Sequence, residues 1–321
     1  MPRPSAGRLR EIAFDTLRRA AARRGYALVR GDEVLAKPGP GEYDLVRRSY
    51  DSPIPHLDEL PADICDRRSD LAGGIELNVG RAIDAIESEL APYVAELDFP
   101  LEGPAAPGQF FLRNQNYQSV DAELLYAMVR QRRPRRVLEL GSGYTTLLIG
   151  MAARRNAEEG VETEHVAFDP YPRPQVVGEE PPPPTRLEPV SAMDVPAAEF
   201  EALGSGDFLF VDTTHTVKLG SDVNRIVLDL LPTLAPGVVV HFHDVFLPWE
   251  YPRVWIEERQ YYWGEQYLLQ AFLAFNDEFE VLLPAHAVAR EHPGRLTAAI
   301  PSFDPPPGRL VGPAAFWIAR R

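Results

Sequence analysis

Two groups of histidine and aspartate in the second half of the chain could carry out chemistry. Asp212 and His215 lie three residues apart in the segment Val-Asp-Thr-Thr-His, and His243 and Asp244 end the segment His-Phe-His-Asp. Imidazole and carboxylate groups bind divalent transition metals, and an imidazole also has an intrinsic pKa suited to a general base. These residues indicate a metal centre or a site of proton transfer. Alternatively, the aspartates could cap helices and His215 could simply pair with Asp212.

A glycine turn earlier in the chain has the composition of a ligand-binding loop. The segment Glu-Leu-Gly-Ser-Gly-Tyr, residues 139–144, follows an apolar stretch, and its glycines let the backbone approach a ligand. A dinucleotide fingerprint would need a third glycine where this chain has Thr146, which disfavours NAD. Glu139 suits a different ligand, because a carboxylate can pair with a cationic amino-acid group. A tight turn that binds no ligand is the alternative.

Short apolar segments alternate with helical patterns from about residue 110 onward, and these elements must position the candidate residues. We expect strands over 136–140, 165–168, 187–190, 207–211, 237–242, 279–283 and 315–319. We expect helices from a cap at Ser119 to Pro134, and over 145–155, 197–203, 221–231 and 265–276.

This alternation predicts an α/β fold: a doubly wound, Rossmann-like, mostly parallel sheet with helices on both faces. The carboxyl ends of parallel strands share one edge of the sheet, and ligands bind at that edge. Gly141, Asp169, Asp212 and His243 all follow predicted strands. We therefore expect the glycine turn and the histidine–aspartate groups to meet there.

The first part of the chain reads differently, with many prolines and few periodic patterns. One amphipathic helix is expected over 78–97, where Val79, Ile83, Ile86 and Leu90 recur at helical spacing. We expect an N-terminal, mainly helical or irregular extension over 1–110 that serves as a lid, substrate cap or oligomer contact. The main domain would span 111–321.

The glycine turn and the strand-end acids resemble those of class I S-adenosylmethionine-dependent methyltransferases. Residues 139–144 resemble the first motif of that family, and Asp169 stands where the family places an acid on the ribose hydroxyls. The segment Ser-Ala-Met-Asp, 191–194, resembles the stretch that lies along the adenine. The likeness spans roughly 114–283 and implies S-adenosylmethionine as cofactor. The residues it assigns to that cofactor are Glu139, Gly141, Ser142, Gly143, Tyr144, Asp169, Met193, Asp194 and Asp212.

The histidine–aspartate groups are similar to the metal site of cation-dependent O-methyltransferases of the catechol and macrocin types. The resemblance implies a divalent metal held by Asp212, His243 and Asp244, with a histidine where the family has an acid. That departure favours Zn, Fe, Co or Ni over Mg. His215 stands where the catechol type has a catalytic lysine. The implied catalytic residues are His215, as the base that deprotonates an acceptor hydroxyl, and Asp212.

The acceptor that fits this reading is a small molecule such as a sugar or a secondary metabolite. Aromatic residues over 246–252 and 261–263 could wall its pocket, or form a hydrophobic cover or oligomer contact. Two other functions stay open. One is an iron-dependent hydroxylase similar to the cephalosporin hydroxylase group, with Asp212, His215 and His243 as ligands. The other is a non-catalytic module that binds S-adenosylmethionine.

Composition limits the partners and the location. The formal net charge is 33 − 47 = −14, which disfavours nucleic acid as a partner. Cys65 is the only cysteine, so an internal disulfide is excluded and a reducing cytoplasm fits. Neither a secretory signal nor an apolar run long enough for a membrane is present in the sequence. We expect a cytoplasmic protein, with homo-oligomerisation left open.

Overall fold

The computed structural model describes residues 16–17, 19–21, 23, 26–30, 43–47, 51–71, 73–103, 109–172, 184–304 and 312–321. The chain divides into two compact units. The first comprises Met1–Cys65 with Pro252–Tyr262, and the second comprises Asp66–Tyr251 with Trp263–Arg321. In the first unit, β1 (Tyr26–Arg30) pairs antiparallel with β2 (Tyr43–Arg47). The same unit includes the 3-10 turn η1 (Leu57–Glu59) and the short helix α8 (Arg253–Glu257). The turn η2 (Ile64–Asp66) spans the point in the chain where the first unit ends and the second begins.

The second unit begins at Asp66. The predicted extension over 1–110, as a lid, substrate cap or oligomer contact before a main domain over 111–321, stays a prediction. The predicted helix over 78–97 forms as a continuous run of α2 (Val79–Ala85), the π-helical η3 (Ile86–Leu90) and α3 (Ala91–Val94). Ile83 and Ile86 are fully buried. The run contacts α4 (Asp121–Arg132) and α10 (Ala285–Glu291). Its apolar face is therefore buried against elements of the second unit.

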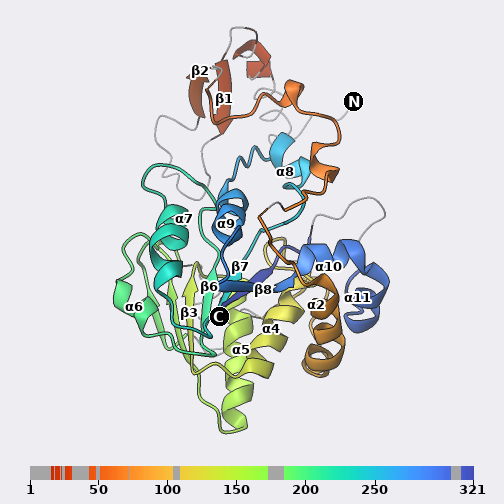
Figure 1. Cartoon of the computed structure of the whole chain (residues 1–321), viewed down its shortest axis with the longest axis vertical. Helices are drawn as coiled ribbons and strands as arrows, with labels where there is room; N and C mark the ends of the chain where they lie inside the picture. Colours follow the sequence, from red (N-terminus) through yellow and green to blue (C-terminus); the bar gives the residue numbers. More distant parts are fainter. Residues whose placement is uncertain are drawn as a thin grey trace. The chain divides into compact units, whose positions relative to one another are not determined.

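A seven-stranded sheet forms the centre of the second unit, with helices around it (Figure 1). The strand order is β5-β4-β3-β6-β7-β9-β8, in which β5, β4, β3, β6 and β7 are parallel and β9 runs antiparallel to both of its neighbours. The strands are β3 (Arg136–Leu140), β4 (Glu164–Phe168), β5 (Arg186–Glu188), β6 (Phe208–Val211), β7 (Val239–Phe242), β8 (Phe279–Pro284) and β9 (Phe316–Arg320). The predicted doubly wound, mostly parallel sheet and its strand positions are confirmed.

The strand order reverses between β3 and β6, which are neighbours in the sheet but not in the chain. Every residue of β3, β6 and β7 is buried, as expected for parallel strands covered on both faces. Polar side chains that act on a ligand are then confined to the ends of these strands. The reversal point is where doubly wound folds bind ligands.

Most predicted helices form, with ends that differ by a few residues. They are α5 (Tyr144–Glu158), α6 (Ala197–Glu201), α7 (Asp222–Asn224) continuing through η5 (Arg225–Leu230) and η6 (Leu231–Thr233), and α9 (Glu265–Leu273). Among the described helices, α10, α11 (Pro293–Ala299) and α8 of the first unit were not predicted. Pro293 opens α11, and proline is well tolerated in the first turn of a helix.

The predicted cap at Ser119 is wrong. The helix α4 begins at Asp121, and its N-cap position, Val120, makes no side-chain cap bond. The hydroxyl of Ser119 instead shares a 2.6 Å hydrogen bond with the hydroxyl of Ser302. The Ser119 side chain therefore bonds to a residue that is distant in the sequence and does not cap the helix.

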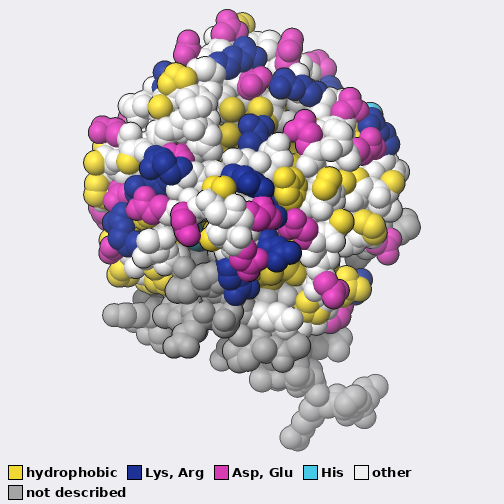
Figure 2. All heavy atoms as spheres, turned by 90° about the horizontal axis from the view of Figure 1, so that it is seen from below, with side chains coloured by type: hydrophobic (Ala, Val, Ile, Leu, Met, Phe, Trp, Pro, Cys, Tyr) yellow, Lys and Arg dark blue, Asp and Glu magenta, His cyan; other side chains and the backbone are white. Residues whose placement is uncertain are grey.

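The described surface mixes charges of both signs. Figure 2 shows Lys and Arg side chains lying among Asp and Glu side chains on one face of the molecule. Ion pairs between partly exposed groups, such as Arg295 with Glu87, follow the same pattern. None of the helices in the described ranges combines the length and the apolar character that a bilayer span needs.

Candidate active site

The glycine turn after β3 lies against the end of β6. Gly141 has a φ of +88°, a conformation that residues with a side chain rarely adopt. A Cβ atom on Gly141 would lie 2.0 Å from the carbonyl oxygen of Asp212. The backbone N–H of Asp212 donates to the carbonyl of Leu140 over 3.0 Å. The predicted cofactor turn is therefore in backbone contact with the first residue of the histidine–aspartate cluster.

The turn is open at its next glycine. A Cβ atom on Gly143 would have no other atom within 4 Å. The N–H of Gly143 donates to the hydroxyl of Thr146 over 2.9 Å, so the residue that replaces the third glycine closes the first turn of α5. Tyr144 packs edge-on against Phe110 and Phe111. A ligand can approach the backbone in front of Gly143.

Glu139 is fully buried, and both of its carboxylate oxygens are bound by neighbouring side chains. Oε1 accepts hydrogen bonds from the hydroxyls of Thr145 and Thr146 at 2.6 and 3.0 Å, and Oε2 lies 2.8 Å from Nε2 of His165. The carboxylate thereby ties β3 to α5 and to β4. Its predicted pairing with a cationic amino group of the cofactor stays a prediction, and these contacts give Glu139 a second role in shaping the turn.

Asp169 reaches the same turn from the end of β4. Its Oδ2 accepts from the backbone N–H and from the hydroxyl of Ser142, both at 2.8 Å, and its Oδ1 accepts from the N–H of Tyr171 at 2.7 Å. The side chain is half-buried and therefore accessible at the edge of the sheet. The two predicted cofactor segments thus touch each other, as the parallel strand arrangement requires.

The predicted adenine segment forms an exposed turn after β5. Met193 and Asp194 are both exposed, and the N–H of Asp194 donates to the carbonyl of Ser191 at 2.8 Å. Arg225 supports this turn from η5, donating to the carbonyls of Ala192 and Val195 at 2.6 and 2.5 Å. The contacts of Met193 and Asp194 with adenine stay predictions.

The two histidine–aspartate groups form one cluster at the ends of β6 and β7. Nε2 of His215 lies 3.2 Å from Oδ1 of Asp212 and 3.7 Å from Oδ2 of Asp244. Nδ1 of His243 lies 3.7 Å from Oδ2 of Asp212 and 3.5 Å from Oδ1 of Asp244. Each carboxylate therefore directs one oxygen toward each imidazole.

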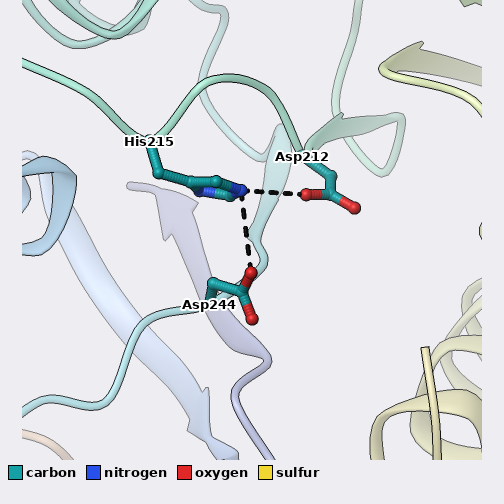
Figure 3. A group of neighbouring side chains, drawn as sticks. All are labelled: Asp212, His215 and Asp244. Atoms are coloured by element: carbon teal, nitrogen blue, oxygen red, sulfur yellow. Dashed lines mark ion pairs between the residues drawn. The ribbon is translucent and has the colours of Figure 1, made fainter. Parts of the chain in front are cut away.

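Three ligand atoms in this cluster are close enough to share one cation. They come from Asp212, His215 and Asp244 and lie within 4.8 Å of one another. Figure 3 shows both carboxylates reaching toward the same ring nitrogen of His215. The predicted metal set had His243 in place of His215. This set also differs from the hydroxylase alternative, which required two histidines and one carboxylate.

Glu265 is the main site residue that the sequence analysis did not assign. It begins α9, is 1% exposed, and places Oε2 2.8 Å from Nδ1 of His215. The ring of Trp263 lies against His215, with centroids 4.4 Å apart. The signal was present in the sequence, because Glu265 shares a helix face with Leu269 and Leu273, both buried. An acid on the apolar face of a helix indicates a buried partner.

Asp121 and Tyr117 complete the other side of the cluster. Asp121 accepts from the N–H groups of Ala314 and Ala315 at 2.8 and 3.0 Å, and its Oδ2 lies 3.8 Å from Nε2 of His243. Tyr117 packs its ring on His243 at 4.7 Å and brings its hydroxyl 3.2 Å from Nε2 of His241.

His241 is a packing residue. It stacks on Phe210 with centroids 4.2 Å apart, and burial lowers its pKa well below the ordinary value, which keeps the ring neutral. This agrees with its place in the middle of a buried strand, in alternation with Phe242.

The charges of the cluster determine its protonation. Burial alone would lower the pKa of His215, but the carboxylates of Glu265 and Asp212 outweigh it and hold that pKa well above its ordinary value. The pKa of His243 is also raised, because Asp244 and Asp212 outweigh burial. Without a cation, both imidazoles therefore carry protons at neutral pH.

The pKa values of Asp212 and Asp244 shift in opposite directions. Burial dominates at Asp244 and raises its pKa. At Asp212, burial would also raise the pKa, but the imidazoles of His243 and His215 outweigh it and lower the pKa. Because 34% of the Asp212 side chain is exposed, water weakens the burial effect and supports the lowered value. Asp212 is therefore the negative charge around which the imidazolium groups gather.

Most of the aromatic segment after β7 is buried and is not available to wall a pocket. Phe246 and Trp249 pack edge-on against His286, and Tyr251 packs against Trp263. Trp263 is half-buried and is the member of this group that lies directly on the cluster. A role for it beside the acceptor stays a prediction.

One family model matches part of the second unit. Residues 138–245 match the family model described as a methyltransferase domain. This stretch begins in β3, ends just after β7 and contains the glycine turn, Asp169 and Asp212. A search of curated proteins returned no match. Over these residues, the family match and the strand order support the class I methyltransferase domain that the sequence predicted.

Two solved structures are similar to this chain at low sequence identity. One is the apo structure of CmcI, with 14% identity over 57% of this chain and 77% of that chain and a TM-score of 0.35. The other is a candidate methyltransferase from Thermobifida fusca YX, with 14% identity over 79% of this chain and 96% of that chain and a TM-score of 0.32. Both TM-scores are below 0.5, so the assignment of the domain rests on the family match and on the chain's own topology.

Proposed function

We propose that this protein transfers a methyl group from S-adenosylmethionine to a hydroxyl group of a small-molecule acceptor, with a divalent cation at Asp212, His215 and Asp244. The observation that carries the proposal is the backbone contact between Gly141 and Asp212. It places the predicted cofactor turn beside the one histidine–carboxylate group among the described residues that could hold a metal ion. A cofactor on the turn and an acceptor at the cluster would therefore be neighbours.

The residues around the turn fit a sulfonium nucleoside in most respects. Gly143 leaves space for a close backbone approach, and Asp169 offers a half-buried carboxylate at the edge of the turn. Bound S-adenosylmethionine would supply a methyl group activated by its positive sulfur. The chain's part is to orient that group and to keep water from the acceptor. Glu139 fits less well as a direct ligand, because its oxygens are already bound by Thr145, Thr146 and His165.

The cluster also fits a divalent cation. Two carboxylates and one imidazole converge within 4.8 Å, and imidazole favours Zn, Fe, Co or Ni over Mg. A cation held there would act as a Lewis acid that lowers the pKa of an acceptor hydroxyl. Asp212, His215 and Asp244 would hold it, and Trp263 would cover one side of His215.

His215 cannot be a metal ligand and a general base at the same time. Both roles need the lone pair on Nε2, because Nδ1 is bound to Glu265. Without a cation, the raised pKa of His215 keeps the ring protonated at neutral pH, and a protonated imidazole cannot accept the acceptor's proton. We therefore prefer the ligand role for His215 over the predicted base role.

Calorimetry with S-adenosylhomocysteine, S-adenosylmethionine and NAD tests the cofactor, and elemental analysis of the purified protein tests the metal. We expect the two sulfur nucleosides to bind, NAD to show no binding, and a transition metal to be present. Methyl transfer is then measured with phenolic, catechol and sugar hydroxyls, with and without added Zn²⁺, Co²⁺ and Mg²⁺. Tight NAD binding without nucleoside binding would overturn the proposal. Nucleoside binding with no transfer to any acceptor would favour a non-catalytic binding module.

A matched pair of variants separates the site from the fold. Asp212 and Asp207 flank the same strand, β6, at its carboxyl and amino ends. Asp207 is 2% exposed and bonds to Arg135 and to the backbone of Arg136. We expect Asp212→Asn to remove metal binding and methyl transfer. We expect Asp207→Asn to lower stability while the folded protein still binds metal.

A further inference from the structure

We propose that Glu265 is a positioning residue that fixes the tautomer and the ring orientation of His215, so that Nε2 of His215 is presented to a cation between Asp212 and Asp244. The inference rests on the metal site proposed above and adds to it a residue outside the three candidate ligands. It also predicts which class of metal the site prefers.

Trp263, Gly264 and Glu265 contact both the ring and the backbone of His215. Oε2 of Glu265 lies 2.8 Å from Nδ1, and Glu265 is itself 1% exposed at the start of α9. The N–H groups of Gly264 and Glu265 donate to the carbonyl of His215 at 3.0 and 3.2 Å. Trp263 packs on the ring. Three consecutive residues therefore fix both the backbone and the side chain of His215.

The backbone of the site is itself in an uncommon conformation. His215 has a φ of +54° and Asp244 a φ of +59°, in the left-handed region that residues with side chains seldom occupy. Such conformations persist where surrounding contacts enforce them, and they concentrate at functional sites. The bonds from Gly264 and Glu265 to the carbonyl of His215 are contacts of that kind.

The tautomer follows from the chemistry of the partner. An ionised carboxylate only accepts hydrogen bonds, so with Glu265 ionised the 2.8 Å contact places the proton on Nδ1 of His215. In a neutral ring, Nε2 then carries the lone pair. That lone pair faces Oδ1 of Asp212 at 3.2 Å and Oδ2 of Asp244 at 3.7 Å. Three acceptor atoms that converge in this way repel one another unless a proton or a cation lies between them.

Glu265 also tunes the ligand that it orients. A carboxylate bonded to the outer nitrogen of a metal-binding histidine makes the inner nitrogen a stronger donor. One imidazole and two carboxylates, supported in this way, suit a borderline divalent cation such as Zn²⁺ or Co²⁺ better than Mg²⁺. The Oε1 atom of Glu265 is buried and has no hydrogen-bond partner among the described residues. The carboxylate is therefore committed to His215.

Zn²⁺ calorimetry on the full-length protein, stripped of metal with a chelator, tests the proposal. Glu265→Gln keeps the shape and an acceptor oxygen but removes the charge. Glu265→Leu removes the charge and the acceptor oxygen. We expect Zn²⁺ affinity to fall by about 10-fold in the first variant and by about 100-fold in the second. The control is Glu199→Gln, which removes a largely buried carboxylate bonded to Arg136 and Arg186 at the other end of the sheet. We expect that control to bind Zn²⁺ as the wild type does.

Nitrogen-15 spectra of the histidine rings supply a readout that a merely structural role would not move. In the Zn²⁺-loaded wild type, we expect Nδ1 of His215 to stay protonated while the signal of Nε2 shifts on metal binding. Unchanged Zn²⁺ affinity in Glu265→Leu would overturn the inference. So would metal attachment at Nδ1, or a His215 ring that does not respond to Zn²⁺. Binding of S-adenosylhomocysteine to the same samples is scored separately, so failure of the methyl-transfer proposal is distinguishable from failure of this one.

Discussion

The carbonyl oxygen of Asp212 lies 2.0 Å from the position that a Cβ atom on Gly141 would occupy. The glycine turn and the histidine–aspartate cluster therefore meet through backbone atoms. Because main-chain positions are set by the sheet, the relation between the two sites is fixed by the pairing of β3 with β6. Substitution at the turn should accordingly affect the fold or the cofactor, depending on which glycine is changed.

Alanine substitutions at Gly141 and at Gly143 are expected to have different effects, the first on stability and the second on cofactor binding. Gly141→Ala introduces a side chain at φ +88° and against a carbonyl oxygen, and we expect a loss of about 3 kcal/mol or more in the free energy of unfolding. Gly143→Ala meets no atom within 4 Å, and we expect stability to change by less than about 1 kcal/mol while affinity for S-adenosylhomocysteine falls at least about 10-fold. Chemical denaturation and calorimetry measure both. Gly141→Ala with wild-type stability would contradict the close approach seen here.

We expect substitutions of Glu139 and Asp169 to differ in their effect on cofactor binding. Glu139→Gln places an amide where Thr145, Thr146 and His165 surround a carboxylate, and we expect a loss of about 1–3 kcal/mol in stability. Affinity of the folded variant for S-adenosylhomocysteine should stay within about 3-fold of wild type. Asp169→Asn, at a half-buried carboxylate, should weaken binding of S-adenosylhomocysteine. It should also cost some stability, because an amide replaces an oxygen that accepts from Ser142. If Glu139→Gln abolished binding and left stability unchanged, Glu139 would be a direct cofactor ligand after all.

The strand-end positions of the site could be predicted because short apolar strands followed by Gly or Asp are visible in one sequence. The turn after β3 and the acids after β4 and β6 were placed correctly for this reason. The parallel sheet then brings them to one edge without further information. This is why Asp169 and Ser142, which are far apart in the chain, could be expected to lie close together.

The choice between the two imidazoles could not be predicted, because it depends on loop conformation. His215 and Asp244 adopt left-handed backbone angles, and Glu265 reaches His215 from a helix fifty residues later in the chain. Neither feature has a local signature that distinguishes His215 from His243. The internal partners of Glu139 are equally long-range, since His165 lies on the neighbouring strand. Pairing of buried polar groups is decided by tertiary packing.

Arg130 joins three helical segments and should be sensitive to a change that keeps its charge. It is 2% exposed and bonds to Glu96 with two nitrogens at 2.9 and 3.0 Å, to Glu159 at 2.6 Å and to Asn156. A lysine has one ammonium group and cannot reproduce this fork. We expect Arg130→Lys to lower the free energy of unfolding by about 2–4 kcal/mol.

The control for Arg130 is an exposed arginine with a single partner. Arg155 pairs with Glu158 at 2.8 Å, and more than half of each side chain is exposed. Arg155→Lys should change stability by less than about 0.5 kcal/mol. Equal losses in the two variants, measured by urea denaturation, would mean that burial of the Arg130 network contributes nothing specific.

The buried ring of His286 should make stability depend on pH below neutrality. Burial lowers the pKa of His286 to about 4. Its Nδ1 donates to the carbonyl of Pro313 at 3.1 Å, and its ring packs edge-on against Phe246 and Trp249. In the unfolded chain the pKa returns to about 6.5, so the unfolded state binds the extra proton first. Stability is therefore complete above about pH 6.5 and is lost as the pH falls toward 4, by about 3 kcal/mol in all.

A variant without the titrating ring isolates this effect from the other acidic groups. The free energy of unfolding of the wild type and of His286→Gln is measured between pH 7 and pH 4 by urea denaturation. We expect the free energy of unfolding of the wild type to fall relative to that of His286→Gln as the pH decreases across this interval. The reason is that protonation of His286 opposes folding only in the wild type. Two curves that stay parallel from pH 7 to pH 4 would show that His286 is not held neutral by its surroundings.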